Sequence, residues 1–488
     1  MQPLRSKSSH ARLAITAPVL ALLALAAFGA GEREAHASGY LSARFGADMG
    51  GPHQANGYAV YYNPAALGGT KGTSITGDVS VAVRFASYER PVSALSPSKD
   101  EILLKDDYVK ANTGKATLTN ALPLPFVSLN TDFGGSKWLR GGLAVYIPFG
   151  GAANWTRNDK ADNPLAIGAV DGVQRWHNIS GQIMALYTTG ALAVNMSEWG
   201  AKGFSAGINV SGIYHHVETV RARNDNGSDD TTSTLGKLVE GRSYVNASGF
   251  NMSVGAGIYY EPEDRAYRLG LSYTSQPGFG QTRMNGTLTQ VFASSAVGGD
   301  QDIDFLQTYP DIVRFGYAQK FGKRWEIATD LEYVRWSVFN KQCVVLAGKD
   351  CKLTPQGDNV PGVTPEPVVL NIPRNWNDAF LVRVGPAYQA SDRVNLFASM
   401  SVNTPAVPKS TIDASTIDAL RIGVTAGVRW QATDHLALGF AYNHFGYFSV
   451  VSREGAQYTF ARASKSPNAS GTYSAQIALF NTNVSYTF

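Results

Sequence analysis

Five arginines occupy alternating positions in strand-like segments, where each would share a face with other polar residues. A guanidinium can bind a carboxylate through two parallel hydrogen bonds, whether that carboxylate belongs to the protein or to a ligand. Because a buried charge needs a partner, we expect an ion-pair network on a polar interior face. Its predicted members are Arg268, Arg314, Arg383, Arg421, Arg429, Asp330 and Glu332.

Two other cations stand just past the ends of alternating segments. Arg221 and Lys341 are better placed than the network arginines to meet an acid that arrives from outside, so they are candidates for holding a ligand carboxylate. One or two of the interior arginines could serve the same purpose. The sequence leaves this choice open.

Patterns typical of catalysis or metal binding are weak in this sequence. Residues 203–207 (GFSAG) have the spacing of a hydrolase nucleophile, but they open an alternating segment instead of a strand-turn-helix elbow. His215 and His216 are adjacent, so in a strand they would face opposite sides and could not share one metal. We expect no enzyme, no catalytic residue, no metal site and no cofactor.

The first forty residues predict export from the cytoplasm. Arg5, Lys7 and Arg12 precede an apolar stretch at 13–30, and Ala-His-Ala at 35–37 is a cleavage pattern. We therefore expect a signal peptide at 1–37, with a transmembrane anchor as the alternative. An oxidising compartment favours a disulfide between the only two cysteines, Cys343 and Cys351.

The segments that must position these residues alternate with a period of two. In residues 420–430, Leu420, Val424 and Trp430 share an apolar face, while Arg421 and Arg429 share a polar one with Gly and Thr. Similar patterns run from about residue 72 to Phe488. A soluble sandwich or an outer-membrane barrel could produce this alternation. Aromatics at 138, 176, 325, 336, 430, 442, 486 and 488 suit the interfaces of a membrane barrel.

Connection lengths decide between these two folds. Short turns near 134–137, 197–202, 261–265, 321–324, 390–393 and 432–435 alternate strictly with long connections. A transmembrane barrel has tight turns on the periplasmic side and long loops outside. The sequence therefore predicts an all-β fold, a transmembrane antiparallel barrel of about 14 strands over residues 72–488.

Composition agrees with this fold class and excludes others. The 488 residues include 50 Gly and are only 16% charged, with a net charge of +4. A charge this mild excludes a dedicated nucleic-acid binder. A mean hydropathy of −0.14 excludes a polytopic helical membrane protein, which needs several apolar runs of about 20 residues.

The segment at 38–71 does not alternate, and it is rich in Gly and small residues. It contains Asn63, Pro64 and Ala65 within the stretch NPAAL, and its aromatic content favours a plug packed in the lumen over a flexible tail. With the signal peptide, the strand number, the stretches at 313–339 and 378–445 and the terminal Phe488, this segment resembles the outer-membrane long-chain fatty-acid and aromatic-hydrocarbon transporter family.

The resemblance implies passive uptake of hydrophobic molecules across the outer membrane. A ligand would enter through a groove among the outer loops, bind inside the barrel and leave sideways at a kinked third strand. Asn63, Pro64 and Ala65 would belong to the hatch that moves. The kink is predicted at Pro148, Phe149, Gly150 and Gly151, because proline lacks the N–H that a ladder needs and glycine holds register poorly.

Several partners and alternatives accompany this hypothesis. We expect a monomer in contact with outer-membrane lipid and lipopolysaccharide, with Phe488 read by the barrel-assembly machinery and with no nucleic-acid partner. The ligand remains open among fatty acids, alkanes and aromatic hydrocarbons. The rival functions are a water-filled diffusion porin and an outer-membrane lipid hydrolase using Ser205 or another hydroxyl, and a surface-receptor role could accompany any of them.

Overall fold

The computed structural model describes residues 41–42, 44–157, 170–291, 299–355, 357–453 and 466–488. The predicted signal peptide at 1–37 lies outside the described residues. Within the described ranges, no helix combines the length and the apolar character that crossing a membrane requires.

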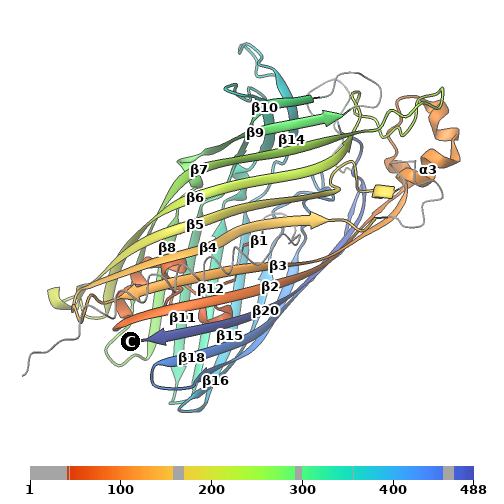
Figure 1. Ribbon diagram of the computed structural model, residues 1–488. Coiled ribbons are helices and arrows are strands. Elements are labelled where there is room, and N and C mark those ends of the chain that lie inside the picture. Colours follow the sequence, from red (N-terminus) through yellow and green to blue (C-terminus); the bar gives the residue numbers. More distant parts are fainter. Residues whose placement is uncertain (1–40, 43, 158–169, 292–298, 356, 454–465) are drawn as a thin grey trace, which may run out of the picture. The chain divides into compact units, whose positions relative to one another are not determined.

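Fourteen antiparallel strands in the described part of the chain form the wall of a closed barrel (Figure 1). The strands follow one another around the wall in chain order, and β20 closes on β2 from Ser74↔Thr487 to Glu89↔Thr472. The predicted fold class is thereby confirmed. The wall strands are β2 (Thr73–Arg90), β3 (Gly114–Thr131), β4 (Leu139–Asn154), β5 (Ser180–Asn195), β6 (Phe204–Arg223), β7 (Gly241–Tyr260), β8 (Tyr267–Thr274), β11 (Ile312–Phe321), β12 (Trp325–Val334), β15 (Ala379–Ser391), β16 (Val394–Asn403), β17 (Arg421–Gln431), β18 (Leu436–Tyr447) and β20 (Gly471–Thr487).

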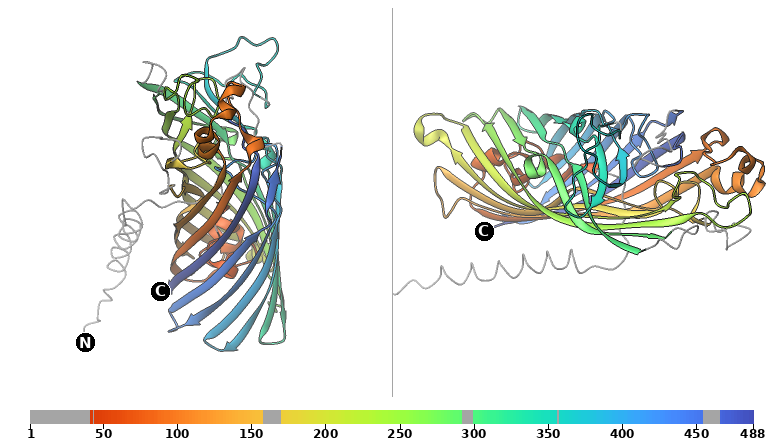
Figure 2. Two further views of the ribbon diagram at one scale, coloured as in Figure 1. Left: turned by 90° about the vertical axis from the view of Figure 1, so that its right-hand side faces the viewer. Right: turned by 90° about the horizontal axis from the view of Figure 1, so that it is seen from above.

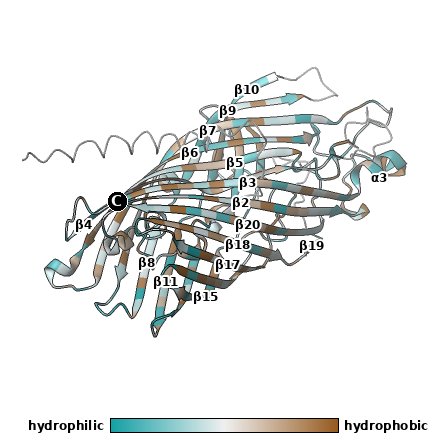
Figure 3. Cartoon of the chain, turned by 60° about the horizontal axis from the view of Figure 1, so that its bottom comes forward, coloured by the Kyte–Doolittle hydropathy of each residue, from teal (hydrophilic) through white to brown (hydrophobic). Residues whose placement is uncertain are grey.

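Side chains on the wall reverse the pattern of a soluble protein. Met400 is 63% exposed, whereas its neighbours Ser399 and Ser401 are buried. Apolar and polar residues alternate in this way along many of the wall strands (Figure 3). An outward apolar face and an inward polar face are what a strand needs between lipid and a lumen.

Short turns and long loops alternate around the barrel as predicted. The turn at 322–324 joins β11 to β12, for example, while residues 335–378 separate β12 from β15. Two of the long connections contain a further sheet, in which β9 (Gln281–Val291), β10 (Gly299–Thr308), β13 (Lys341–Leu346) and β14 (Val368–Pro373) pair in succession. This sheet continues the wall because β7 pairs with β8 over its second half and with β9 over its first.

The segment between residue 44 and β2 runs along the inner side of the wall in the ribbon (Figure 2), and side chains of β6 and β8 hydrogen-bond to its backbone. Phe45 and Tyr58 are completely buried and both contact Phe126 of β3. Asn209 of β6 donates a 2.9 Å hydrogen bond to the carbonyl of Val60. The segment contains the helix α2 (Ala59–Tyr62) and the 3₁₀ helices η1 (Ala47–Met49) and η2 (Pro64–Gly69).

The remaining described elements are short and mostly lie in the connections. They are β1 (Leu41–Ser42), β19 (Val450–Ser452), the helix α3 (Asp106–Asn112) and the 3₁₀ helices η3 (Val92–Ala94), η4 (Asp100–Leu104), η5 (Met196–Trp199), η6 (Pro277–Phe279) and η7 (Trp336–Val338). Buried ion pairs link the connections between wall strands: Arg90, the last residue of β2, contacts Asp229 at 2.7 Å, and Arg175 contacts Glu240 at 3.1 Å. These loops are therefore held together by charge as well as by apolar packing.

Two of the aromatics expected at the membrane interfaces are instead buried. Trp176 lies in a loop under the Arg175 guanidinium, and Trp336 packs among other aromatic rings in the interior. Trp138, Trp325 and Trp430 are about half exposed, as interface residues should be. A position at a strand end does not by itself distinguish the membrane interface from the protein interior, because the long connections also bury aromatic residues.

Candidate functional site

The barrel wall is interrupted between β3 and β4. These strands pair only from Phe126↔Tyr146 to Thr131↔Gly141. Beyond Phe126, toward the loop end, β3 continues to pair with β2 but not with β4. In this interval the free edge of β4 pairs instead with β1, at Gly150 and Phe149. The ladder of the wall is therefore broken between β3 and β4 over this interval, which we call the side opening, and the start of the described chain pairs with β4 there.

The irregularity that causes this opening coincides with the residues predicted to kink the third wall strand. The register between β4 and β5 shifts between Tyr146 and Phe149, the interval that holds Pro148. Pro148 has no N–H to offer a ladder, so regular pairing cannot pass through it. Gly150 packs without a side chain beside Leu124 of β3; a Cβ there would lie 3.6 Å from the Leu124 Cδ2.

Aromatic rings line the interior side of the kink. Phe149 lies 5.8 Å from Tyr309, 6.1 Å from Trp336 and 6.4 Å from Tyr187, measured between ring centroids. All four rings are buried. This cluster was not predicted from the sequence, although the inward register of Tyr187 in β5 was a usable signal. The cluster offers an apolar surface beside the side opening.

A narrow cavity of about 70 Å³ adjoins the kink on its loop side. Gly151 and Ala153 of β4 form part of its wall. The apolar part of its lining comes from Ile183, Val217, Val245, Phe305, Leu370 and Ile372. The polar part, which we call its polar end, includes Arg221, His177 and Glu218. We call this cavity the inner pocket.

The polar end of the inner pocket has unused hydrogen-bonding groups. Arg221 is 7% exposed, and its Nη2 has no hydrogen-bond partner among the described residues. Nε2 of His177 is buried and equally without a partner there. Burial lowers the pKa of His177 to about 4, so its imidazole is neutral at pH 7. A buried guanidinium with a free N–H at the end of an apolar pocket is suited to a ligand carboxylate.

Lys341, the other candidate for the ligand carboxylate, lies elsewhere. It is on β13, in the sheet beyond the wall, and its ammonium donates to the backbone carbonyl of Leu353. It does not line the inner pocket, although its neighbour Gln342 does. Burial lowers the pKa of Lys341. The nearby Cys343 and Cys351 form a disulfide in the same sheet region.

Asn63 holds the N-terminal segment to the wall. Its Nδ2 donates to the carbonyls of Pro52 and Ile258 at 2.8 and 3.0 Å, and its Oδ1 accepts from the N–H of Ala65 at 3.1 Å. The Asn63 side chain thus caps η2, which begins at Pro64. Gly257 permits the close approach, because a Cβ there would lie 2.1 Å from the Asn63 Oδ1.

Most of the predicted interior charges have ionic partners. Arg314 contacts Glu332 at 2.7 Å and also donates to the Tyr61 hydroxyl. The other pairs are Arg383 with Asp330 and with Asp48, Arg268 with Glu326, and Arg421 with Asp418. Arg429 makes no ion pair or side-chain hydrogen bond within the described chain. Three of these partners were not among the predicted members: Asp48 in the N-terminal segment, Glu326 on β12 and Asp418 in a loop.

Comparison with known proteins places the chain in a family. The family described as "Outer membrane protein transport protein (OMPP1/FadL/TodX)" matches residues 26–488. The chain belongs to this family. It is therefore an outer-membrane β-barrel transporter of hydrophobic compounds.

Solved structures of OMPP1/FadL/TodX proteins share the fold at low sequence identity. A Pseudomonas aeruginosa FadL homologue is 16% identical with a TM-score of 0.71, over 93% of this chain and 100% of that one. The Pseudomonas putida toluene transporter TodX is 12% identical with a TM-score of 0.58, over 89% and 94%. The Ralstonia pickettii toluene transporter TbuX is 14% identical with a TM-score of 0.56, over 90% and 98%. No curated protein has significant similarity to the sequence.

Proposed function

We propose that this transporter carries long-chain fatty acids by passive uptake. The acid enters among the outer loops, its carboxylate binds Arg221 in the inner pocket, and its chain leaves through the side opening between β3 and β4. The observation that carries the proposal is the unsatisfied Nη2 of Arg221, within the described chain, at the polar end of a partly apolar pocket whose wall includes the kinked strand. An acyl chain of a dozen carbons gains roughly 10 kcal/mol from an apolar path.

The N-terminal segment at 38–71 acts in this proposal as the hatch. Its contacts through Asn63 hold it beside β7, and a shift of this segment would change the space around Phe149. The acid then enters the lipid directly, without crossing water. The protein works as a monomer surrounded by outer-membrane lipid and lipopolysaccharide, and Phe488 is its signal to the assembly machinery.

A second candidate ligand is an uncharged aromatic hydrocarbon. The ring cluster of Phe149, Tyr187, Tyr309 and Trp336 beside the opening favours this class, since aromatic rings pack well against one another. A hydrocarbon has no carboxylate and would not need Arg221. Removing the positive charge of Arg221 should therefore distinguish the two candidate ligands, because only the fatty acid needs it.

The test compares uptake of oleate and toluene by a strain that lacks the gene, complemented with variants. Arg221→Gln should reduce oleate binding by the purified protein at least tenfold and leave toluene uptake unchanged. Arg223→Gln is the matched control, because this arginine lies two residues away on the same strand and does not line the inner pocket. Unchanged oleate binding by Arg221→Gln, with toluene uptake still dependent on the protein, would replace the fatty-acid proposal with the hydrocarbon one.

A further inference from the structure

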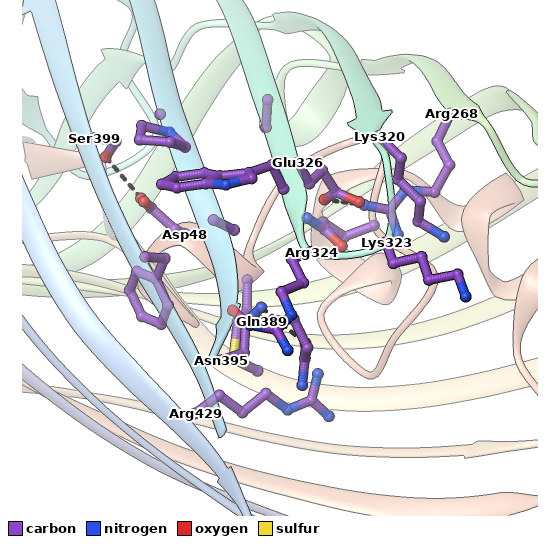
Figure 4. Close-up of a pocket in the computed structure, with 18 of the residues that line it drawn as sticks. Asp48, Arg268, Lys320, Lys323, Arg324, Glu326, Gln389, Asn395, Ser399 and Arg429 are labelled. Atoms are coloured by element: carbon purple, nitrogen blue, oxygen red, sulfur yellow. Dashed lines mark hydrogen bonds and ion pairs between the residues drawn. The ribbon is translucent and has the colours of Figure 1, made fainter. Parts of the chain in front are cut away.

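A larger cavity opens at the turn end of the barrel, opposite the long loops. Its volume is about 410 Å³, and it is lined by wall strands from β8 to β17, by the turn at 322–324 and by the N-terminal segment (Figure 4). The residues of the N-terminal segment that line the cavity are Asp48, Met49 and Gln54. We call this cavity the turn-end vestibule. It shares no lining residue with the inner pocket.

The vestibule carries an excess of positive charge. Its lining includes seven cations and four acids: Arg268, Lys320, Lys323, Arg324, Arg383, Arg393 and Arg429, with Asp48, Glu326, Asp330 and Asp392. Three of the four acids already have cationic partners within the protein. Glu326 pairs with Arg268 and Asp330 with Arg383, while Asp48 pairs with Arg383 and with Arg44.

The cations that remain have few partners. Lys320, Lys323 and Arg429 make no side-chain hydrogen bond or ion pair within the described residues. Arg324 has only the Tyr388 hydroxyl in that part of the chain, at 3.2 Å. Arg429 is the most informative of these, because its side chain is partly buried on the inward face of β17, opposite Asn395. A partly buried guanidinium without a counter-charge favours the binding of an anion.

The vestibule also offers apolar surface. Phe397 of β16 is 8% exposed and lines the cavity together with Met49 and Ala387. A cavity with unpaired cations and an apolar wall matches a small organic acid better than an inorganic anion. The carboxylate of such an acid can contact the cations while its apolar part packs against the apolar wall. Its volume suits a small molecule, and a folded protein domain could not enter it.

We propose that the turn-end vestibule is a second ligand site, which binds the carboxylate of a small amphiphilic acid through Arg429 and Lys323. The site lies beyond the lateral route proposed above and does not depend on Arg221. It also adjoins the contacts that hold the N-terminal segment, because Arg383 and Asp330 line both the vestibule and a smaller cavity. An acid bound here occupies an axial position between this segment and the periplasm.

The test uses the full-length mature protein in lipid nanodiscs and benzoate as the probe. Calorimetric titration should detect benzoate binding, with at least tenfold weaker binding of the uncharged benzyl alcohol. The double variant with Lys323→Gln and Arg429→Gln should bind benzoate at least tenfold more weakly than wild type. Lys323→Gln alone changes an exposed turn residue, so it should fold normally and still weaken binding.

Two control variants show whether benzoate binding depends on this cavity in particular. Lys202→Gln removes an exposed cation from a different short turn, so benzoate binding should not change. Arg221→Gln should retain the vestibule binding even if it abolishes oleate binding. The proposal is overturned if wild type does not bind benzoate or if the double variant binds it with wild-type affinity. It is also overturned if all variants lose affinity equally, or if only Arg221→Gln loses it.

Discussion

Arg383 on β15 and Asp48 in the N-terminal segment form an ion pair of 2.9 Å, although they lie 335 positions apart in the chain. The same guanidinium donates to the carbonyls of Ala47 and Gly50 and pairs with Asp330 on β12. It is only 5% exposed. One side chain thus connects two wall strands to the N-terminal segment.

Replacing Arg383 with Gln should loosen this segment and open a water path through the barrel. The substitution leaves Asp48 with Arg44 at 3.5 Å and Asp330 with the His53 imidazole at 3.0 Å, and breaking a buried ion pair typically costs about 3–5 kcal/mol. We expect low conductance from the wild-type protein in planar bilayers and clearly larger, fluctuating conductance from Arg383→Gln. The control is Arg393→Gln, an exposed arginine whose only ionic contact among the described residues, with Asp434, is at 3.9 Å. Steady porin-like conductance from the wild type would favour the diffusion-porin alternative.

Asn63→Asp should weaken the attachment of the N-terminal segment more than Asn63→Ala does. Alanine removes three hydrogen bonds and should destabilise the attachment of the segment by about 1–3 kcal/mol. Aspartate keeps the acceptor for Ala65 but turns an oxygen toward the carbonyls of Pro52 and Ile258. We therefore expect the aspartate variant to be more damaging at pH 7. Protease sensitivity of residues 44–72 in folded barrels measures both, and an aspartate variant as resistant as wild type would contradict these contacts.

Linking β3 to β4 across the side opening should block lateral exit. Leu124→Cys combined with Gly150→Cys places thiols on the two strands where they approach without pairing. A short bifunctional thiol reagent should then stop uptake of oleate and toluene while leaving ligand binding intact. Each single-cysteine variant, treated in the same way, is the control; the native cysteines are already joined in a disulfide. Normal uptake after complete cross-linking would show that ligands leave by another path.

Acid should destabilise the loop that carries His177. The folded-state pKa of about 4 is lower than the ordinary value of 6.5, so the folded loop favours the neutral imidazole. The contribution of the neutral imidazole to the stability of the folded loop is fully present above pH 6.5. It is lost as the pH falls toward 4, by at most about 1.4 kcal/mol per pH unit. The charged groups that face His177 are Asp413, Arg90, Arg221 and Arg374.

Hydrogen exchange at residues 170–179 measures this effect, after correction for the intrinsic pH dependence of exchange. Protection should decrease between pH 7 and pH 5 in the wild type. The decrease should be much smaller in His177→Gln, which has no imidazole to protonate. The same loss of protection in both proteins would assign the acid sensitivity to another group.

The wall of the barrel could be predicted from the sequence because its information is local. Alternation in segments such as 420–430 determines which residues face lipid. The length of each connection indicates the side of the membrane on which that connection lies. Pro148 similarly predicts an irregular strand wherever the strand is placed. The 14 strands and their order follow from these local patterns.

Tertiary structure decided which side chains meet inside the lumen. Nothing local distinguishes Arg221, which lines the inner pocket, from Lys341, which contacts a carbonyl outside it. Alternation shows that Arg429 points inward, but only the folded chain shows that Asp48 reaches Arg383 and leaves Arg429 without a partner among the described residues. These contacts join segments that lie far apart in the sequence, so they depend on how the loops and the N-terminal segment pack against the wall.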